Sequence, residues 1–412
     1  MKPDKPILTS LLQNDFYKIT MWLFIWKHFP DIRATFGFKN RTFGVPLAKH
    51  IDIGKIREQF DEARKIKLTR DETDWIAGTD TDFIEFIKGF SLPEYLLERD
   101  GDNFRIEFPG LWTHTTQWEI PCLLIISTLL SQARLRDFSR AEREGVMAQS
   151  TLNLLEKITK IKSYRHTHEF TFSDFGTRRC FSPEWQDHVV GIMKEELPTQ
   201  FRGTSNCYLA KKYNLMPMGT RAHELDMIVA ALAGEDDDKV RQAPFEVCRL
   251  WSPGTFGNDL QTHLPDTFGS DYFFEHAPSE FAKWKAVRQD SGDPYVLGEK
   301  TVRWYEKHGE KTTDKILIPS DGLNVDLMLK LHTHFRPRIS TSPGWGTNLT
   351  NDMGFRHIFR PVSIVVKPIE ANGRPTVKLS DNIAKAIGDP KEIERYKKIF
   401  HYTSTVNQAC TY

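Results

Sequence analysis

Short apolar stretches that end in polar or glycine-rich corners recur along the second half of the chain. Each leads into a segment with helical spacing of apolar residues, and this alternation is typical of parallel strands joined by crossover helices. In a closed (β/α) barrel, the loops that follow the strands gather on one face and build the active site. Six strand-and-corner pairs occur: residues 168–172 with 173–176, 215–216 with 219–220, the stretch around 260 with 266–269, 284–287 with 288–292, 315–318 with 320–322, and 338–339 with 343–348.

These six corners are unevenly spaced. A doubly wound sheet is the alternative architecture, but six polar corners suit the mouth of a barrel better. We therefore predict an irregular (β/α) barrel over residues 121–380, which begins with a helical stretch over 121–160. Near its end, two strand-like runs flank Asn372-Gly373, a dipeptide typical of a hairpin turn.

The first 120 residues lack this alternation of strand-like and helical segments. A helical stretch rich in aromatic residues begins at Asn14, strand-like alternation occurs at 34–39 and again at 104–108, and a polar helical region covers about 53–88. We predict a separate N-terminal α+β domain over 1–120. The tail, residues 381–412, contains a further helical stretch and is a candidate for packing back on this domain.

Composition narrows the class of protein. With 412 residues, 39% of them hydrophobic, the chain can bury a large core in two domains or one elaborated barrel. The net charge of +1 gives no sign of a nucleic-acid surface or a polybasic membrane segment. The longest apolar stretch, near 123–130, is far shorter than the roughly 20 residues of a membrane span. No signal-peptide pattern opens the chain, so we expect a cytoplasmic protein.

The cysteines support the same location. They are odd in number, widely scattered and lack a C-x-x-C pair, which indicates reduced thiols and no structural zinc. The five are Cys122, Cys180, Cys207, Cys248 and Cys410.

His223 stands in the most informative local setting. Pro217 and Gly219 mark a break, after which apolar residues recur at helical spacing from Leu225. We therefore place His223 in the first turn of a helix, with Thr220 as its cap. Free N–H groups and the helix dipole make such a place receptive to phosphate, which a histidine can also carry covalently. A structural hydrogen bond is the alternative role.

Several other corners carry candidate ligand-binding groups. Arg288 and Asp290 combine a bidentate anion binder with a carboxylate suited to ribose hydroxyls or magnesium, although a loop salt bridge would look the same. Phe175 offers an aromatic face beside Arg178. The pair His166-x-His168 lacks a third ligand, so we expect no metal cage made by the protein alone. Neither a Walker loop nor a G-x-G-x-x-G turn is present, which makes a dinucleotide cofactor unexpected and leaves ATP use open.

Seven motifs together resemble the nicotinate phosphoribosyltransferases, a family of type II phosphoribosyltransferases. The resemblance runs from Asn14 to about Asp381, and the motifs stand in the family's order. They are Asp15-x-Tyr17-Lys18, Ser173-Asp174-Phe175-Gly176-x-Arg178-Arg179, Gly203-Thr204-Ser205-Asn206, Gly219-Thr220-x-Ala222-His223-Glu224, Arg288-x-Asp290-Ser291-Gly292, Ser320-Asp321-Gly322 and Gly346-Thr347-Asn348-Leu349-Thr350-Asn351-Asp352.

This resemblance implies a small α/β domain on an irregular barrel, acting as a homodimer with shared active sites. The implied enzyme joins nicotinate to phosphoribosyl pyrophosphate in NAD biosynthesis, giving nicotinate mononucleotide and pyrophosphate. ATP hydrolysis would be coupled through a phosphohistidine, with Mg²⁺ held mainly by substrate phosphates and, on the protein side, by Asp290 or Asp321.

Residue roles follow from the same resemblance. His223 matches the phosphohistidine, and Arg288 and Asp290 match other catalytic residues. Phe175 would stack on the pyridine ring, with Tyr17 of a partner subunit covering it. The remaining substrate-binding positions are Arg178, Thr204, Ser205, Thr220, Asp321, Gly322, Gly344, Gly346 and Thr347. Trp345 departs from the family, because smaller apolar residues are usual inside the phosphate loop.

Three other functions compete with this one. Nicotinamide-using relatives carry an acidic residue in the Gly-Thr motif, where this chain has Ser205; a hydroxyl can donate to a carboxylate that an aspartate would repel, which favours nicotinate. A non-catalytic phosphosugar-binding barrel would not need His223 and Arg288 together. A phosphohistidine relay protein would not need Tyr17 and Phe175.

Overall fold

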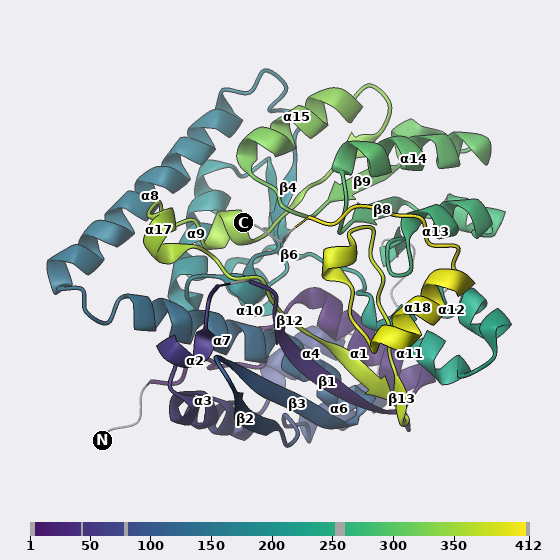
Figure 1. Ribbon diagram of the computed structural model, residues 1–412. Helices are drawn as coiled ribbons and strands as arrows, with labels where there is room; N and C mark the ends of the chain where they lie inside the picture. The colour runs from purple at the N-terminus through teal and green to yellow at the C-terminus, as the bar shows by residue number, and fades with distance from the viewer. Residues whose placement is uncertain (1–4, 43, 78–80, 252–259, 409–412) are drawn as a thin grey trace.

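The computed structural model describes residues 5–42, 44–77, 81–251 and 260–408. An antiparallel sheet with its helices lies at the bottom of Figure 1, and parallel strands with their helices lie above it. This arrangement is the mixed α/β fold expected from the sequence. Among the described residues, no helix combines the length and apolar character that a bilayer crossing requires.

The antiparallel sheet has five strands in the order β13-β12-β1-β3-β2. Its strands are β1 (Arg33–Asn40), β2 (Leu96–Asp100), β3 (Asn103–Leu111), β12 (Ile364–Ala371) and β13 (Arg374–Pro375). The expected hairpin is confirmed, because Glu370 pairs with Pro375 and Ala371 with Arg374. The hairpin also pairs along β1, from Ala34 with Ala371 to Asn40 with Ile364. Residues that we had grouped with the barrel thus complete the N-terminal sheet.

Eight parallel strands form two sheets of four, in the orders β11-β4-β5-β6 and β10-β9-β8-β7. If the two sheets are placed end to end in a ring, the strands follow one another in chain order from β4 to β11, and β11 pairs with β4. This order is that of a (β/α) barrel. Over the described residues, the ring is open between β6 and β7 and between β10 and β11. The strands are β4 (Phe172–Asp174), β5 (Phe201–Thr204), β6 (Met216–Pro217), β7 (Thr262–His263), β8 (Ala286–Gln289), β9 (Ile316–Pro319), β10 (Ser340–Thr341) and β11 (Gly344–Trp345).

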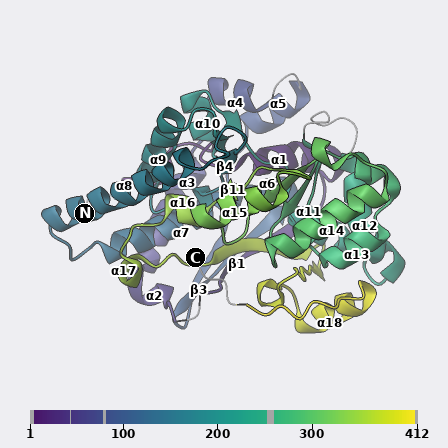
Figure 2. The same cartoon turned by 90° about the horizontal axis from the view of Figure 1, so that it is seen from above.

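Helices cover both parts, as the two views show (Figures 1 and 2). The N-terminal part holds α1 (Phe16–His28), α2 (Leu47–His50), α3 (Ile53–Lys65), α4 (Arg70–Ala77), α5 (Thr81–Lys88) and α6 (Trp112–Thr115). The barrel part holds α7 (Glu119–Arg134), α8 (Arg140–Lys162), α9 (Pro183–Glu196), α10 (Cys207–Tyr213), α11 (Glu224–Ala233), α12 (Asp237–Trp251), α13 (Ser270–His276), α14 (Pro294–Lys307), α15 (Val325–Phe335), α16 (Thr347–Thr350) and α17 (Arg356–Phe359), with α18 (Pro390–Ile399) in the tail.

Local sequence explains where these helices begin. Ser139 caps α8 with a full capping box, since its hydroxyl accepts from Glu142 N–H while the Glu142 side chain accepts from Ser139 N–H. Asp293 and Asp389 cap α14 and α18, each directly before a proline in the first turn. The tail helix α18 packs on the barrel side, where Phe400 stacks on Phe268 with ring centroids 4.3 Å apart. We had considered packing of the tail on the first domain. The tail contacts that domain before α18, where Arg41 donates to the Lys385 carbonyl.

The N-terminal segment is joined to the barrel of its own chain by backbone hydrogen bonds. Phe16 N–H donates to the Ser205 carbonyl at 2.7 Å, and Cys207 N–H donates to the Asn14 carbonyl at 2.9 Å. Asp15 and Asn206 form an antiparallel bridge. The start of α1 is therefore fixed beside the end of β5, which brings residues some 190 positions apart to one place.

Candidate active site

One pocket lies where the carboxyl ends of the parallel strands face the N-terminal sheet, and it encloses about 1110 Å³ including its open mouth. It collects most of the predicted site residues: Tyr17, Phe175, Arg178, Ser205, His223, Arg288, Asp290, Asp321, Gly322, Gly346 and Thr347. It also contains residues that we did not predict to bind a ligand: Asp15, Arg41, Arg179, Met218, Ala222, Ser320, Leu323, Asn348, Val365, Lys367, Lys378 and Lys385.

Three predicted residues do not line this pocket and support it from behind. Thr204 is fully buried and donates its hydroxyl proton to Asp174 at 2.7 Å. Gly344 lies against the Phe175 ring, where a Cβ would come within 2.2 Å of a ring carbon, so only glycine lets that ring sit there. Thr220 faces the hollow between the two parallel sheets, and its carbonyl accepts from Thr20.

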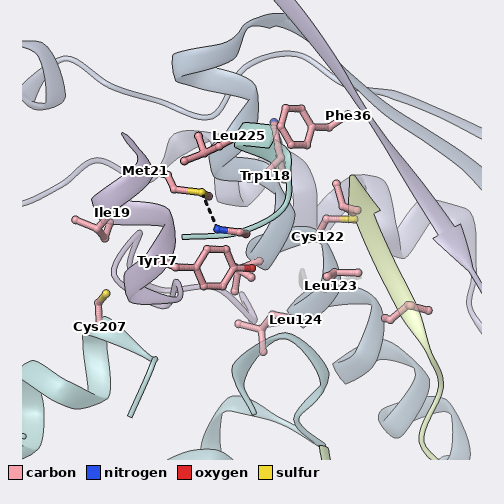
Figure 3. Packing of buried hydrophobic residues seen from close by; sticks show 14 of the residues in the cluster. Tyr17, Ile19, Met21, Phe36, Trp118, Cys122, Leu123, Leu124, Cys207 and Leu225 are labelled. Carbon is pink, nitrogen blue, oxygen red and sulfur yellow. Dashed lines mark hydrogen bonds between the residues drawn. The ribbon is translucent and has the colours of Figure 1, made fainter. Parts of the chain in front are cut away.

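Tyr17 lines the pocket of its own chain. That a partner subunit supplies this tyrosine stays a prediction of the family resemblance. Figure 3 shows its ring among residues of the same fold, with Met21 beside it on α1 and Leu123 and Leu124 on α7 nearby. The sulfur of Met21 accepts from Ala222 N–H, which lies next to His223 in sequence. The Tyr17 hydroxyl is buried without a hydrogen-bond partner, so it is available to a ligand.

His223 is held by both ring nitrogens. Its Nδ1 lies 3.0 Å from Thr267 Oγ1, and its Nε2 lies 2.9 Å from Asp290 Oδ2. Burial, and next the charge of Lys378, lower the pKa of His223 to about 4, although the neighbouring carboxylates act in the opposite direction. The ring is therefore neutral near pH 7 and has a lone pair for nucleophilic attack.

The helix after His223 begins one residue later than we predicted. α11 runs Glu224–Ala233, and His223 itself is the residue before it, with no side-chain cap bond. Thr220 is therefore not the cap. The start of the helix is instead fixed through Glu224, whose carboxylate accepts from Thr116 at 2.6 Å and Trp112 at 3.2 Å and pairs with Lys18.

Asp290 and Asp321 are the acidic groups of the pocket beside the strand ends. Arg288 donates to Asp290 Oδ1 at 3.1 Å, and although burial raises the pKa of Asp290, Arg288 and His223 outweigh it and hold it well below its usual range. Lys385 pairs with Asp321 at 2.6 Å. The Nε of Arg288 is buried without a partner, which leaves a donor for a bound anion.

Four cations of the pocket escaped the sequence analysis: Arg41, Lys367, Lys378 and Lys385. They lie beyond β1, on β12 and in the segment after β13, far from the barrel motifs in sequence. No local pattern distinguishes them from surface lysines, and only the pairing of β12 with β1 brings them to the site. Together with Arg178 and Arg288 they make the pocket strongly cationic, which suits a polyphosphate ligand.

Ser205 lines the pocket, and its hydroxyl proton already takes part in a hydrogen bond within the protein. Its hydroxyl donates to Asp15 Oδ1 at 2.7 Å, so the aspartate, and not a ligand, receives that proton. Burial, the largest cause, raises the pKa of Asp15, while Ser205 and the charge of Arg178 act to lower it. Burial acts to lower the pKa of Arg178, but neighbouring acidic groups, among them Asp290 and Asp15, raise it above its ordinary value, so Arg178 stays charged.

The phosphate-loop motif begins as β11 and ends in α16, and Gly346, Thr347 and Asn348 face the pocket. Trp345 is fully buried behind it and packs edge-on to Phe172. Lys157 of α8 lies 5.6 Å from the centre of the Trp345 ring, donates to the Asn348 carbonyl at 2.6 Å and pairs with Asp352 at 2.9 Å. The bulky Trp345 therefore points away from the ligand side and serves as a platform for the loop.

The four cysteines that the structure describes are buried and unpaired, as expected for reduced thiols, and Cys410 lies outside the described residues. One group of potential metal ligands occurs among the described residues, formed by His223, Asp266 and Asp290. Asp266 was not a predicted ligand. Asp266 lies in the predicted corner 266–269. An aspartate directly after a strand-like stretch is the sequence feature that could have identified it as a candidate ligand.

Comparison with known proteins agrees with the geometry. Residues 170–404 match the nicotinate phosphoribosyltransferase (NAPRTase) family, and residues 12–127 match the N-terminal domain of that family. A crystal structure of nicotinate phosphoribosyltransferase from Porphyromonas gingivalis is 30% identical, covers 96% of this chain and 100% of its own, and superposes with a TM-score of 0.82. One from Vibrio cholerae is 28% identical, with coverages of 97% and 95% and a TM-score of 0.83. The chain belongs to the nicotinate phosphoribosyltransferase family.

Proposed function

We propose that this protein makes nicotinate mononucleotide and pyrophosphate from nicotinate and phosphoribosyl pyrophosphate, and couples the reaction to ATP hydrolysis by phosphorylating His223. The observation that carries the proposal is one pocket lined by two aromatic rings, by arginines and lysines, and by a neutral histidine 2.9 Å from Asp290. We assign ring binding to an aromatic end formed by Tyr17, Phe175 and Arg178, and phosphate binding to a cationic end formed by Arg288, Lys378 and Lys385.

At the aromatic end, Tyr17 and Phe175 would hold the flat pyridine ring at low entropic cost, and the Arg178 guanidinium would bind the nicotinate carboxylate. The ring nitrogen of nicotinate is itself the nucleophile. The protein therefore needs to hold it in line with the anomeric carbon and does not need a strong nucleophile of its own for this step.

At the cationic end, the departing pyrophosphate gains negative charge while the sugar gains positive charge. Lys378, Lys385 and Arg288 line the pocket and would bind the leaving group, because fixed charges in a water-poor site stabilise the transition state most effectively. The carboxylates of Asp290 and Asp321 suit ribose hydroxyls or Mg²⁺, which prefers oxygen ligands and stays largely bound to substrate phosphates. When bound, Mg²⁺ would neutralise leaving-group charge.

The ATP reaction would use the lone pair of His223. A ring nitrogen forms a bond to the γ-phosphorus, the bond from that phosphorus to the β–γ bridging oxygen breaks, and ADP leaves with the electron pair. Asp290 Oδ2, 2.9 Å from Nε2, and Thr267 Oγ1, 3.0 Å from Nδ1, would hold the ring in position for this attack. Later transfer of the phosphoryl group to water would release the stored free energy to the second reaction.

Turnover of nicotinate with phosphoribosyl pyrophosphate, measured with and without ATP, tests the proposal. We expect formation of the mononucleotide and a strong preference for nicotinate over nicotinamide. ADP release should exceed the basal ATPase rate only when both substrates are present. Equal use of nicotinamide would support the amide-using alternative, and ligand binding without turnover would support a phosphosugar-binding barrel.

A further inference from the structure

Three potential ligand atoms converge beneath the pocket. His223 Nε2 lies 2.9 Å from Asp290 Oδ2 and 3.9 Å from Asp266 Oδ1, and the three atoms all lie within 4.8 Å of one another. Asp266 is fully buried, and its Oδ1 has no hydrogen-bond partner. A buried carboxylate oxygen without a donor is costly unless a cation satisfies it.

Each of the three residues is fixed on its far side by a second group. Thr267 Oγ1 holds His223 Nδ1 at 3.0 Å, Ser291 donates to Asp266 Oδ2, and Arg288 donates to Asp290 Oδ1 at 3.1 Å. The other polar atom of each residue is the one that belongs to the group of three. Anchors of this kind orient the ligands of metal sites in proteins.

The proton of Thr267 decides which nitrogen of His223 has the lone pair. Thr267 donates its only hydroxyl proton to Asp226 Oδ2 at 2.7 Å, and Arg221 pairs with that carboxylate at 3.1 Å. Thr267 must then accept a proton from Nδ1–H, so in the neutral ring Nε2 has the lone pair. Nε2 and two carboxylate oxygens would then face one another as three acceptors, and a cation bound between them would satisfy all three.

We propose that His223, Asp266 and Asp290 form a binding site for a divalent transition metal of the zinc or cobalt class. One imidazole nitrogen and two carboxylates suit such ions, whereas Mg²⁺ prefers oxygen ligands only. Tetrahedral metal bonds of about 2.0–2.2 Å place ligand atoms roughly 3.3–3.6 Å apart, so the 2.9 Å separation would widen, and the 3.9 Å separation shorten, by about half an ångström. Lys378, 3.9 Å from Asp290 Oδ2, is the cation that opposes occupancy.

A metal at this site would block the ATP reaction, because it would occupy the nitrogen lone pair of His223. This consequence rests on the proposed function, whereas binding of the metal does not. Zinc should therefore inhibit phosphorylation of His223, and excess Mg²⁺ should not reverse the inhibition, because Mg²⁺ does not compete for imidazole nitrogen.

Titration of the chelator-treated, dialysed protein with Zn²⁺ by calorimetry, and with Co²⁺ by visible absorption, tests the site. We expect one tight site per chain. Thr267→Val should weaken it about 10–100-fold, since loss of a second-layer anchor has that effect, and Thr267→Ser should restore it. Asp266→Asn should weaken it at least as much. His334→Gln is the matched control, because His334 also lies 2.9 Å from a carboxylate, that of Glu299, on the surface.

Thermal melting of each variant separates loss of metal from loss of fold. Unchanged zinc affinity in folded Asp266→Asn and Thr267→Val, or loss of the tight site in His334→Gln, would overturn the proposal. If zinc binds as expected while ATP never labels His223, the metal site stands and the proposed ATP coupling fails.

Discussion

Lys18 and Glu224 form an ion pair whose two side chains are both completely shielded from solvent. Lys18 comes from α1 in the N-terminal part, and Glu224 directly follows His223 at the start of α11. Lys18 also pairs with Glu119 at 2.6 Å, and Glu119 pairs with Lys367 of the pocket at 2.6 Å. A continuous buried chain of charges thus links the pocket to the residue proposed to carry phosphate.

Loss of Lys18 should be severe. Burial opposes its charge, but Glu119 and Glu224 raise the pKa of Lys18 above its ordinary value. Removing Lys18 leaves the buried Glu224 carboxylate without a cation and leaves Glu119 with Lys367 alone, so Lys18→Met should destabilise the protein by about 3–5 kcal/mol. Lys212→Met, which breaks the more exposed pair with Asp187, should cost less than about 1 kcal/mol.

Urea unfolding followed by fluorescence measures both variants. If Lys18→Met and Lys212→Met unfold at the same urea concentration, the buried charge chain does not stabilise the fold.

The position of Tyr17 predicts that one chain makes a whole site. Tyr17→Ala and Arg288→Ala should each be weak, with the loss of an aromatic stack alone worth about 1–3 kcal/mol. Mixing the two variants under conditions that exchange any subunits should leave activity at the mutant level, because every chain holds one of the two lesions. Recovery to roughly a quarter of wild-type activity would instead show sites shared in a symmetric dimer.

Lys157 is predicted to act on the phosphate loop without touching the substrate. Lys157→Met removes its bonds to the Asn348 carbonyl and Asp352, and should raise the KM for phosphoribosyl pyrophosphate severalfold with a smaller change in kcat. Lys157→Arg should recover part of the loss. Lys160→Met is the control, since Lys160 lies one turn away on α8 in an exposed pair with Asp326. Equal KM values in the two methionine variants would remove Lys157 from this role.

The effect of replacing Ser205 on substrate preference should depend on the residue that replaces it. Because its hydroxyl already donates to Asp15, Ser205→Ala should change the ratio of kcat/KM for nicotinate and nicotinamide less than about threefold. Ser205→Asp puts a second carboxylate beside Asp15 and near the expected nicotinate carboxylate. A charge pair about 4 Å apart can cost on the order of 4 kcal/mol, so nicotinate use should fall at least roughly tenfold. A collapse of nicotinate preference in Ser205→Ala would show that the hydroxyl serves the substrate directly.

The sequence predicted the parts of the fold that depend on local patterns. The six corners correspond to β4, β6, β7, β8, β9 and β10, because polar residues after short apolar strands are a local signal. It missed β5 and β11, whose four and two residues carry no apolar run long enough to notice. The pairing of β12 with β1 is a contact between positions more than 300 apart, which no local pattern encodes.

The same division applies to the site. His223, Arg288 and Asp290 were predicted because each stands in a compact motif at a strand or helix end. Lys378 reaches the site only through tertiary contacts, whereas Asp266 stands in a predicted corner whose ligand-binding role the sequence did not reveal. The partner-subunit origin of Tyr17 came from family resemblance alone. The hydrogen bond from Phe16 N–H to the Ser205 carbonyl, which holds the start of α1 beside the barrel of the same chain, has no local sequence signal.

The most direct test of the account is transfer of phosphate from ATP to His223. Wild-type protein and His223→Asn would be incubated with γ-labelled ATP and Mg²⁺, quenched in base and analysed for acid-labile phosphate by mass spectrometry of the peptide that contains residue 223. The account predicts label on His223, released when nicotinate and phosphoribosyl pyrophosphate are added, and none in His223→Asn. Label of wild-type amount in His223→Asn, or turnover of ATP with the substrates but no label at residue 223, would contradict it.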